Sequence, residues 1–412
     1  MTRNFAYNLI SLGSRLLVGL VLFVILARLW GPARFGLFTF VFSFTALLIL
    51  LVDFGFHLYL LREVAMNPSR AAKLISDSFR AKCVLAAGST GIGICLIAVI
   101  GPNILPPDLA APLFLTALAL SFSELFAAPL RALGHFDQEA IVVAISNLVQ
   151  FTLVGITAWY GGDVVHVAWA MLISRTIFLA LAYRQIRQVV PLLNLRGSIA
   201  SGSIGTLRRV WTYGAEATFI LAWTQLDIVA VRALFGTEVV GTYSAGQKIV
   251  GGLCALTAVT GNVMIPRLSR LAIGLDAAFW TMARNTILIM ALIGTFLALP
   301  LVLFSSQLID LLYGHSFRNL IEIMPYLGVV LILRYTNTGA SAAAIAAGLY
   351  RTRILAPLLG LLSTAALIPV IIGAGPTLSR FMIIYISGIA VMLATYAWSL
   401  YRARAARSTK AS

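Results

Sequence analysis

Eight charged side chains stand within long apolar stretches of the sequence. The four cations are Arg15, Arg175, Lys248 and Arg334, and the four acids are Asp53, Glu124, Glu216 and Asp227. An ionised group inside a membrane costs roughly 2.5–3.5 kcal/mol on insertion scales, so such residues usually face a cavity or a partner. Guanidinium groups bind compact anions well, often through two parallel hydrogen bonds. The pattern therefore indicates either an anion-binding path or a set of internal ion pairs.

Both interpretations of these charges remain open from the sequence. At about 1.5 Å per helical residue, the four cations would lie roughly 10–25 Å from the inner ends of their helices, so they could pass an anion across the membrane. Alternatively, each acid pairs with a cation and only fixes helix packing, or takes part in ion coupling. Asp53 and Arg15 stand at similar depth on neighbouring stretches and form a serious candidate pair.

The composition places these charges in a membrane protein. Hydrophobic residues make up 60% of the 412 residues and charged residues 11%, and the mean hydropathy is +0.96. A soluble domain is nearer one half apolar and one quarter charged. We therefore expect an all-α, polytopic fold.

Apolar stretches of membrane length recur along the whole chain. A helix needs about 20 apolar residues to cross a hydrocarbon core of about 30 Å. This length predicts twelve spans, at residues 8–29, 36–58, 83–101, 111–130, 140–160, 164–183, 210–230, 239–265, 283–304, 323–347, 354–373 and 379–401. The first span resembles a signal peptide, but Ile25 stands where a small residue would precede a cut after Ala27, so we expect a retained helix.

The basic residues predict the orientation of these spans. With the N-terminus inside, the inner segments hold 21 lysines and arginines and the outer segments hold five. Because lysine and arginine are enriched in cytoplasmic loops, both termini and the segment 184–209 should be cytoplasmic. The net charge of +16 then reflects topology and contact with anionic lipids, since the basic residues are spread over short loops. We expect no nucleic-acid partner.

Two glycine-containing corners repeat half a chain apart. Gly31 and Gly36 in "GPARFG" have the spacing of Gly236 and Gly241 in "GTEVVG", 205 residues later. Each corner follows the first helix of one half, and glycine suits a tight turn or a close backbone approach. The corners predict structural turns at equivalent places in two halves.

A second pair of similar segments supports the division of the chain into two halves. "LGHF" at 133–136 and "AGLY" at 347–350 both lie between the fourth and fifth predicted helix of a half. We therefore expect an N-terminal lobe at 1–183, a cytoplasmic linker at 184–209, and a C-terminal lobe with a basic tail at 210–412. Six helices per lobe is an even number, which predicts a parallel repeat.

Several stretches resemble one protein family. They are "ARLWGPARFGLF" from Ala27, "VDFGF" at 52–56, "LDIVAVRALFGTEVVGTYSAGQKI" at 226–249 and "LIDLLYGHSF" at 308–317. They are similar to the polysaccharide biosynthesis proteins that flip lipid-linked oligosaccharides, a branch of the multidrug/oligosaccharidyl-lipid/polysaccharide exporter superfamily. In this family, the stretch at 308–317 would be an outer loop before the tenth helix.

The resemblance implies a fold, a cargo and a set of partners. It implies two six-helix lobes around a central cavity, and a polyprenyl-diphosphate-linked glycan moved to the outer leaflet for cell-surface polysaccharide assembly. The cavity cations would then bind the diphosphate. Membrane lipids, a polysaccharide polymerase and other assembly proteins would be the partners. No cofactor or metal is expected, because the four histidines stand singly, without the spacing of metal ligands.

Two other functions remain as alternatives. A drug/cation antiporter of the same superfamily would favour an acidic cavity, whereas here four cations balance four acids. A polysaccharide polymerase or ligase would need a large outer domain, and the longest predicted outer segment, 304–322, is short. We therefore expect a transporter and not an enzyme.

The predicted orientation can be tested with reporter fusions. A periplasm-dependent reporter fused after Arg407 or near Ser201 should be inactive, because both places are predicted to be cytoplasmic. The same reporter placed within 304–322 should be active and serves as the control. Activity at either of the first two places would contradict the topology.

Overall fold

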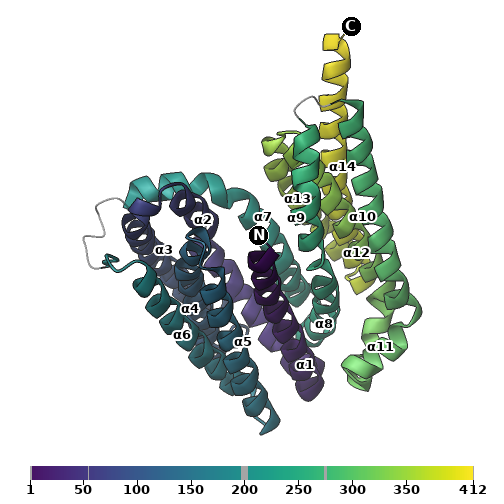
Figure 1. Ribbon diagram of the computed structural model, residues 1–412. Helices are drawn as coiled ribbons and strands as arrows, with labels where there is room; N and C mark the ends of the chain where they lie inside the picture. The colour runs from purple at the N-terminus through teal and green to yellow at the C-terminus, as the bar shows by residue number, and fades with distance from the viewer. Residues whose placement is uncertain (1, 54, 196–202, 273–275, 412) are drawn as a thin grey trace. The chain divides into compact units, whose positions relative to one another are not determined.

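The computed structural model describes residues 2–53, 55–195, 203–272 and 276–411, and within these ranges every regular element is helical. The first part holds α1 (Thr2–Asp53), α2 (Phe56–Met66), η1 (Pro68–Arg70), α3 (Ala71–Ile100), α4 (Pro107–Ala132), α5 (Phe136–Trp159) and α6 (Val164–Val189) (Figure 1). The second part holds α7 (Ser203–Phe235), α8 (Thr237–Cys254), α9 (Thr257–Leu271), α10 (Ala277–Leu303), α11 (Ser305–Leu312), η2 (His315–Ile323), α12 (Met324–Ala346), α13 (Tyr350–Ala374) and α14 (Leu378–Ala411). The prediction of an all-α fold is confirmed.

Ten of the twelve predicted spans each lie on one helix, to within a residue at the ends. The span 36–58 is instead divided between α1 and α2, and the span 239–265 between α8 and α9. Several helices also extend beyond the predicted spans. α3 begins at Ala71 rather than at residue 83, so Lys82 belongs to a helix and not to a loop. The stretch at 308–317 was expected to be an outer loop and is instead largely helical, in α11 and η2. The reason is that Ile309 and Phe317 are fully buried, so this segment packs against the protein.

The helices have the length and surface of membrane spans. Nine segments within the described residues are long and apolar enough to cross a bilayer, and the first of them, Val18–Met66, covers two predicted spans. α7 and the α8–α9 pair are not among these nine. Large apolar side chains are widely exposed, for example Val99 at 82% and Phe296 at 74%. Extensive apolar exposure of this kind suits contact with lipid.

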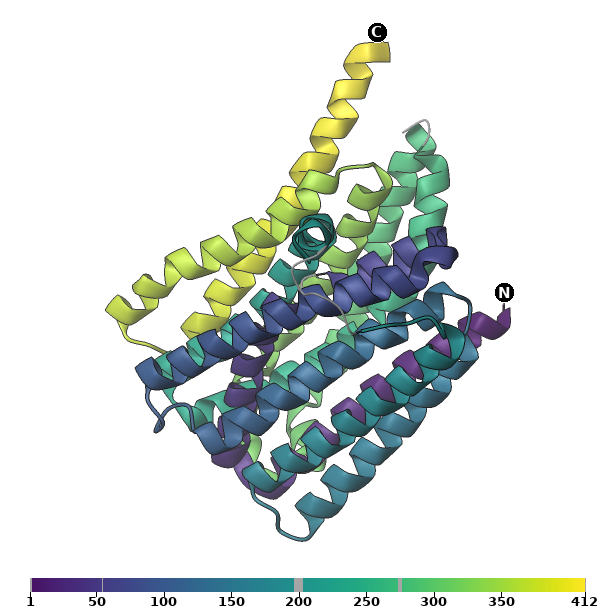
Figure 2. The same ribbon diagram turned by 90° about the vertical axis from the view of Figure 1, so that its left-hand side faces the viewer.

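The chain divides into two compact units. Unit 1 comprises Met1–Trp30 and Leu37–Val229, and unit 2 comprises Gly31–Gly36 and Ala230–Ser412. In unit 1, α4, α5 and α6 run side by side (Figure 2) and α2 packs against α4. In unit 2, α12 packs against α10 and α14, and α13 packs against α14. The predicted lobe boundaries at 183 and 210 stay predictions.

The two glycine corners share one backbone conformation. Gly31 has φ 69° and ψ 175°, and Gly236 has φ 87° and ψ −177°. Positive φ is strained for residues with a side chain, so glycine is required at both places. Each glycine is followed at once by a further helical segment, which makes the corner a sharp break between two long helices.

The later glycines of the two corners approach each other closely. A Cβ added to Gly36 would clash with the Thr237 carbonyl oxygen and lie 2.8 Å from the Gly241 nitrogen, and one added to Gly241 would clash with the Pro32 carbonyl oxygen. Thr237 and Pro32 are themselves 205 residues apart. The contact, which lies within unit 2, is therefore reciprocal: the second glycine of each corner faces the carbonyl at the start of the other corner.

Other turns extend this correspondence. Positive-φ glycines also occur in pairs at Gly101 and Gly314, Gly134 and Gly348, and Gly161 and Gly375. At the second of these pairs, the glycine amide donates to the carbonyl three residues back and the next amide donates to the carbonyl five residues back, in both copies. The same helix-ending motif at matched places supports the proposed internal repeat.

The close approach predicts that alanine substitutions at two glycines of α8 have very different effects on stability. Gly241→Ala should destabilise the protein by about 1–3 kcal/mol, because the new methyl group has no room. Gly251→Ala is the matched control, since nothing lies within 4 Å of its added Cβ. It should be neutral or stabilising by about 0.5–1 kcal/mol. Thermal unfolding of the purified variants in detergent measures both, and equal stability would refute the packing argument.

Candidate functional site

A cavity of about 490 Å³ lies within unit 1. Its walls come from α1, α4, α5, α6 and α7. Most of the lining is apolar and includes Phe23, Phe42 and Phe178. The polar lining is contributed by Asp53, Thr116, Ser121, Glu124, Ser146, Asn147, Gln150, Arg175 and Gln225. An apolar cavity with a few polar groups is the usual form of a ligand site.

Arg175 is the predicted cation that this cavity contains. It stands on α6 with Met171 and Phe178, which lie four residues before and three residues after it and share its helical face. Its Nη1 donates to the Ser146 hydroxyl of α5 at 3.4 Å. The guanidinium is partly buried and borders the cavity, so it is placed to meet an anion there.

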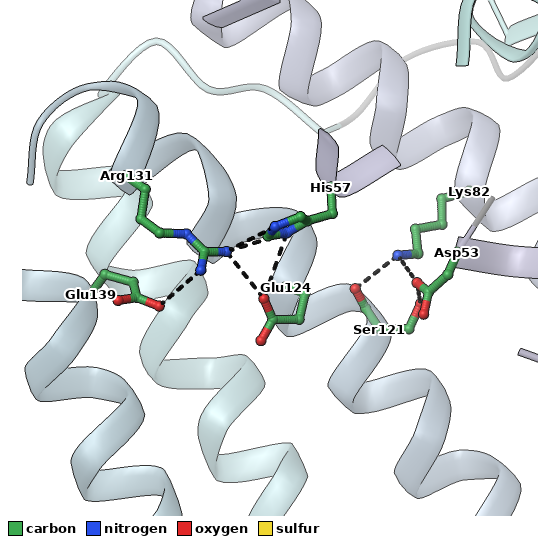
Figure 3. A network of polar contacts seen from close by, with 7 residues as sticks. All are labelled: Asp53, His57, Lys82, Ser121, Glu124, Arg131 and Glu139. Carbon is green, nitrogen blue, oxygen red and sulfur yellow. Dashed lines mark hydrogen bonds and ion pairs between the residues drawn. The ribbon is translucent and has the colours of Figure 1, made fainter. Parts of the chain in front are cut away.

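Asp53 is held by a buried lysine. The Lys82 ammonium lies 2.7 Å from Asp53 Oδ1 and also donates to the Ser121 carbonyl at 2.8 Å (Figure 3). The Ser121 hydroxyl donates to the same carboxylate. Lys82 is 2% exposed, whereas the Asp53 side chain is 46% exposed and lines the cavity. Lys82, assigned from the sequence to a loop, is thus a partner of Asp53 in the helical core.

Glu124 belongs to a second polar cluster. Arg131 Nη2 lies 3.4 Å from Glu124 and 3.2 Å from His57 Nδ1, and Arg131 Nη1 lies 3.6 Å from Glu139 (Figure 3). Glu139 is 1% exposed, and a carboxylate that is so deeply buried needs a cation nearby. The cluster ties the ends of α2, α4 and α5 together, which supports the pairing interpretation for Glu124.

The remaining predicted residues lie elsewhere. In unit 2, Arg334 of α12 donates to the Tyr385 hydroxyl of α14 at 2.6 Å, and Lys248 is partly buried on α8. Asp227 is 6% exposed and accepts from the Ile228 amide at 2.7 Å. The side chains of Arg15 and Glu216 lie outside the described residues. The structure therefore brings Arg175, Asp53 and Glu124 to one cavity.

The sequence missed four polar residues of this region. Lys82 and Arg131 were assigned to inner loops, Glu139 was not singled out, and Gln150 was absorbed into an apolar span. The helical position of Lys82 could have been predicted from the sequence. Lys82 stands directly before an apolar run and lies at least one helical turn from the nearest residue that favours loops. Arg131 and Glu139 could not be recognised locally, because their contact joins α4 to α5, and nothing in the apolar stretch around Gln150 indicates that it lines a cavity.

Comparison with solved structures shows which class of protein has this fold. The fold matches an inward-facing multidrug resistance MATE family transporter of the MOP superfamily, with TM-score 0.68 and 17% identity over 95% of this chain and 94% of that one. It also matches a MOP superfamily transporter from Pyrococcus furiosus, with TM-score 0.65 and 17% identity over 98% of this chain and 95% of that one. The fold is that of a multi-pass membrane transporter.

The particular family follows from sequence. The family model described as "Polysaccharide biosynthesis protein" matches residues 1–272, and the chain belongs to this family. A relative from Shigella dysenteriae named "Putative O-antigen transporter" is 24% identical over 232 residues, which cover 55% of this chain and 56% of that protein. The expected family is confirmed, and the two solved structures with the same fold are transporters.

The buried ion pair predicts an asymmetric response to mutation. Asp53→Asn should destabilise the protein by about 3–5 kcal/mol, because it leaves the buried Lys82 charge without a counter-ion. Lys82→Met should cost less, because Asp53 remains exposed to the cavity. The double variant should recover most of the loss.

A neighbouring pair provides the control. Arg80 and Asp77 form an ion pair at 2.7 Å on the same helix as Lys82. Asp77→Asn should cost less than Asp53→Asn, because Arg80 at 17% exposure keeps more access to water than Lys82 at 2%. Unfolding midpoints in detergent measure all four variants. If the double variant were no more stable than Asp53→Asn, the two side chains would not be coupled.

Proposed function

We propose that this protein moves a polyprenyl-diphosphate-linked oligosaccharide from the cytoplasmic to the outer leaflet of the bacterial inner membrane. The glycan would serve assembly of a cell-surface polysaccharide such as O-antigen, capsule or exopolysaccharide. Family membership and the name of the Shigella relative support a polysaccharide cargo. The observation that carries the proposal is Arg175 at the edge of a mostly apolar cavity.

Arg175 has the chemistry that a diphosphate needs. The barrier to moving this anion is loss of its hydration, which costs several kcal/mol if no group replaces the water. A guanidinium beside apolar walls replaces water with directed hydrogen bonds, and the low dielectric strengthens the attraction. An inside-negative potential further favours outward passage by about 2.3 kcal/mol per uncompensated charge per 100 mV.

The other cations extend the proposed path. Lys248 and Arg334 would receive the headgroup in the C-terminal lobe during alternating access, and Arg15 is a further candidate of the N-terminal lobe. Asp53 and Glu124 are ion-paired, so we assign them first to packing, with ion coupling as a second role. Glu216 and Asp227 remain candidates for either role.

A drug/cation antiporter is the competing function. The solved relatives include a multidrug resistance transporter, and two carboxylates line the cavity of unit 1. However, Asp53 has Lys82 beside it and Glu124 has Arg131 beside it, which lowers the attraction for a cationic drug. A polymerase or ligase is disfavoured by the transporter fold. A polysaccharide polymerase remains a proposed partner.

Reconstitution tests the function and the role of Arg175 together. Proteoliposomes would carry a fluorescent polyprenyl-diphosphate oligosaccharide, and dithionite quenching would report its flipping. Arg175→Ala should slow flipping by about tenfold or more, which corresponds to about 1.4 kcal/mol or more in the barrier. Arg175→Lys should restore part of the rate, because lysine keeps the charge but loses the planar fork.

A matched variant on the same helix separates binding from folding. Arg187 lies 5.9 Å from the Tyr183 ring near the end of α6 and does not line the cavity, so Arg187→Ala should flip at nearly the normal rate. Normal flipping by a stable Arg175→Ala protein would refute the assignment of Arg175. Uptake of a cationic dye without glycan flipping by the unmodified protein would instead support the antiporter.

A further inference from the structure

Gln150 is a buried polar side chain that lines the cavity of unit 1. It stands on α5 and is 6% exposed. Among the described residues its side-chain amide has no hydrogen bond to the protein. Neither amide atom is fully enclosed, so the amide is open to the cavity. Most buried polar groups of folded proteins are hydrogen-bonded. An amide that lines a cavity without such a partner is available to a ligand.

Two further polar groups adjoin Gln150 on the same side of α5. Ser146 is one helical turn away and Asn147 lies between them; both are buried and both line the cavity. The Ser146 hydroxyl accepts from Arg175, so this polar strip, Ser146–Asn147–Gln150, continues directly from the proposed anion-binding residue. The cavity also contains the apolar side chains of Met171 and Phe178.

The chemistry of the strip points to a neutral, hydrogen-bonding ligand. A side-chain amide offers two N–H donors and one carbonyl acceptor and carries no net charge. It therefore adds little to the binding of a phosphate or a cation. Among the described residues there is also no group of three histidine, cysteine or acidic side chains that could hold a metal ion. A ligand group that combines a donor and an acceptor matches the amide best.

We propose that the strip Ser146–Asn147–Gln150 binds an N-acylated amino sugar of the cargo. The Gln150 amide donates an N–H to the acyl carbonyl oxygen. The side-chain oxygen of Asn147 or Ser146, further along the strip, accepts from the acylamino N–H, because these two groups point to opposite sides of a trans amide. Met171 and Phe178 supply apolar surface for the acyl methyl group, and Arg175 lies on the adjoining side for the phosphate. This subsite rests on the proposed glycan transport and names the sugar class that the cavity would select.

The stability of two leucine variants tests whether Gln150 serves binding or folding. If the amide serves a ligand, Gln150→Leu should keep the unfolding midpoint, because the substitution removes no hydrogen bond within the protein. Gln138→Leu is the matched control on the same helix; Gln185 donates to Gln138 at 2.7 Å, so this variant should lose a little stability. A clear drop in the midpoint of Gln150→Leu would overturn the proposal.

Direct binding of free sugars tests the chemistry. Saturation-transfer NMR with the full chain in detergent would use N-acetylglucosamine and glucose as probes. We expect a methyl signal from N-acetylglucosamine, weaker binding of glucose, and a loss of about tenfold in affinity, equal to 1.4 kcal/mol, in Gln150→Leu. Gln138→Leu should bind as the unmodified protein does. Equal binding of the two sugars, no binding of either, or unchanged binding by Gln150→Leu would each refute the subsite.

The flipping assay separates this proposal from the proposed function. If the unmodified protein flips the lipid-linked oligosaccharide and Gln150→Leu flips it at the same rate, then the subsite is wrong and the function stands. If the unmodified protein binds N-acetylglucosamine through Gln150 but flips no lipid-linked glycan, then the subsite stands without the proposed transport.

Discussion

The ion pair between Lys82 and Asp53 is the constraint on which the interior of unit 1 depends. An ammonium that is 2% exposed on a helix of membrane length is tolerable only with a counter-ion and further acceptors. Asp53 and the Ser121 carbonyl provide them, and so α1, α3 and α4 are joined at one point. Because Asp53 also borders the cavity, the same pair fixes one polar edge of the candidate site. A change at this pair should therefore affect both stability and binding.

The glycine corners impose a second constraint, on the backbone. Gly31 and Gly236 break two long helices with the same dihedral angles. Gly36 and Gly241 then allow the two corners to approach each other through their main chains. Gly36 contacts Thr237 at the start of the second corner, and Gly241 contacts Pro32 at the start of the first. A substitution at either glycine therefore disturbs both corners. Close main-chain packing through small residues is a common way for membrane helices to associate without a hydrophobic driving force.

The cavity of unit 1 is lined by polar side chains that a helix bundle optimised only for stability would not place there. Its walls are mostly apolar, but Arg175 and Gln150 border it, and a tightly packed helix bundle would place apolar side chains there. Its two acids are ion-paired with neighbouring cations, and in the proposed function Arg175 and the uncharged strip on α5 would determine what binds. This arrangement agrees with a cargo that carries both an anionic group and neutral sugars.

The sequence alone determined the class of fold, ten of the helical spans and the positions of the glycine corners, because apolar length and glycine requirements are local properties. It also identified Arg175, Asp53 and Glu124 as unusual, since a charge in an apolar stretch is visible without a structure. Only the tertiary structure decided the partners. Asp53 pairs with Lys82, and Glu124 joins Arg131 and His57. Ion pairing and hydrogen bonding depend on distances between helices, and those distances are set by packing rather than by spacing along the chain. For the same reason, only the structure showed that Gln150 lines the cavity without a partner of its own in the described protein.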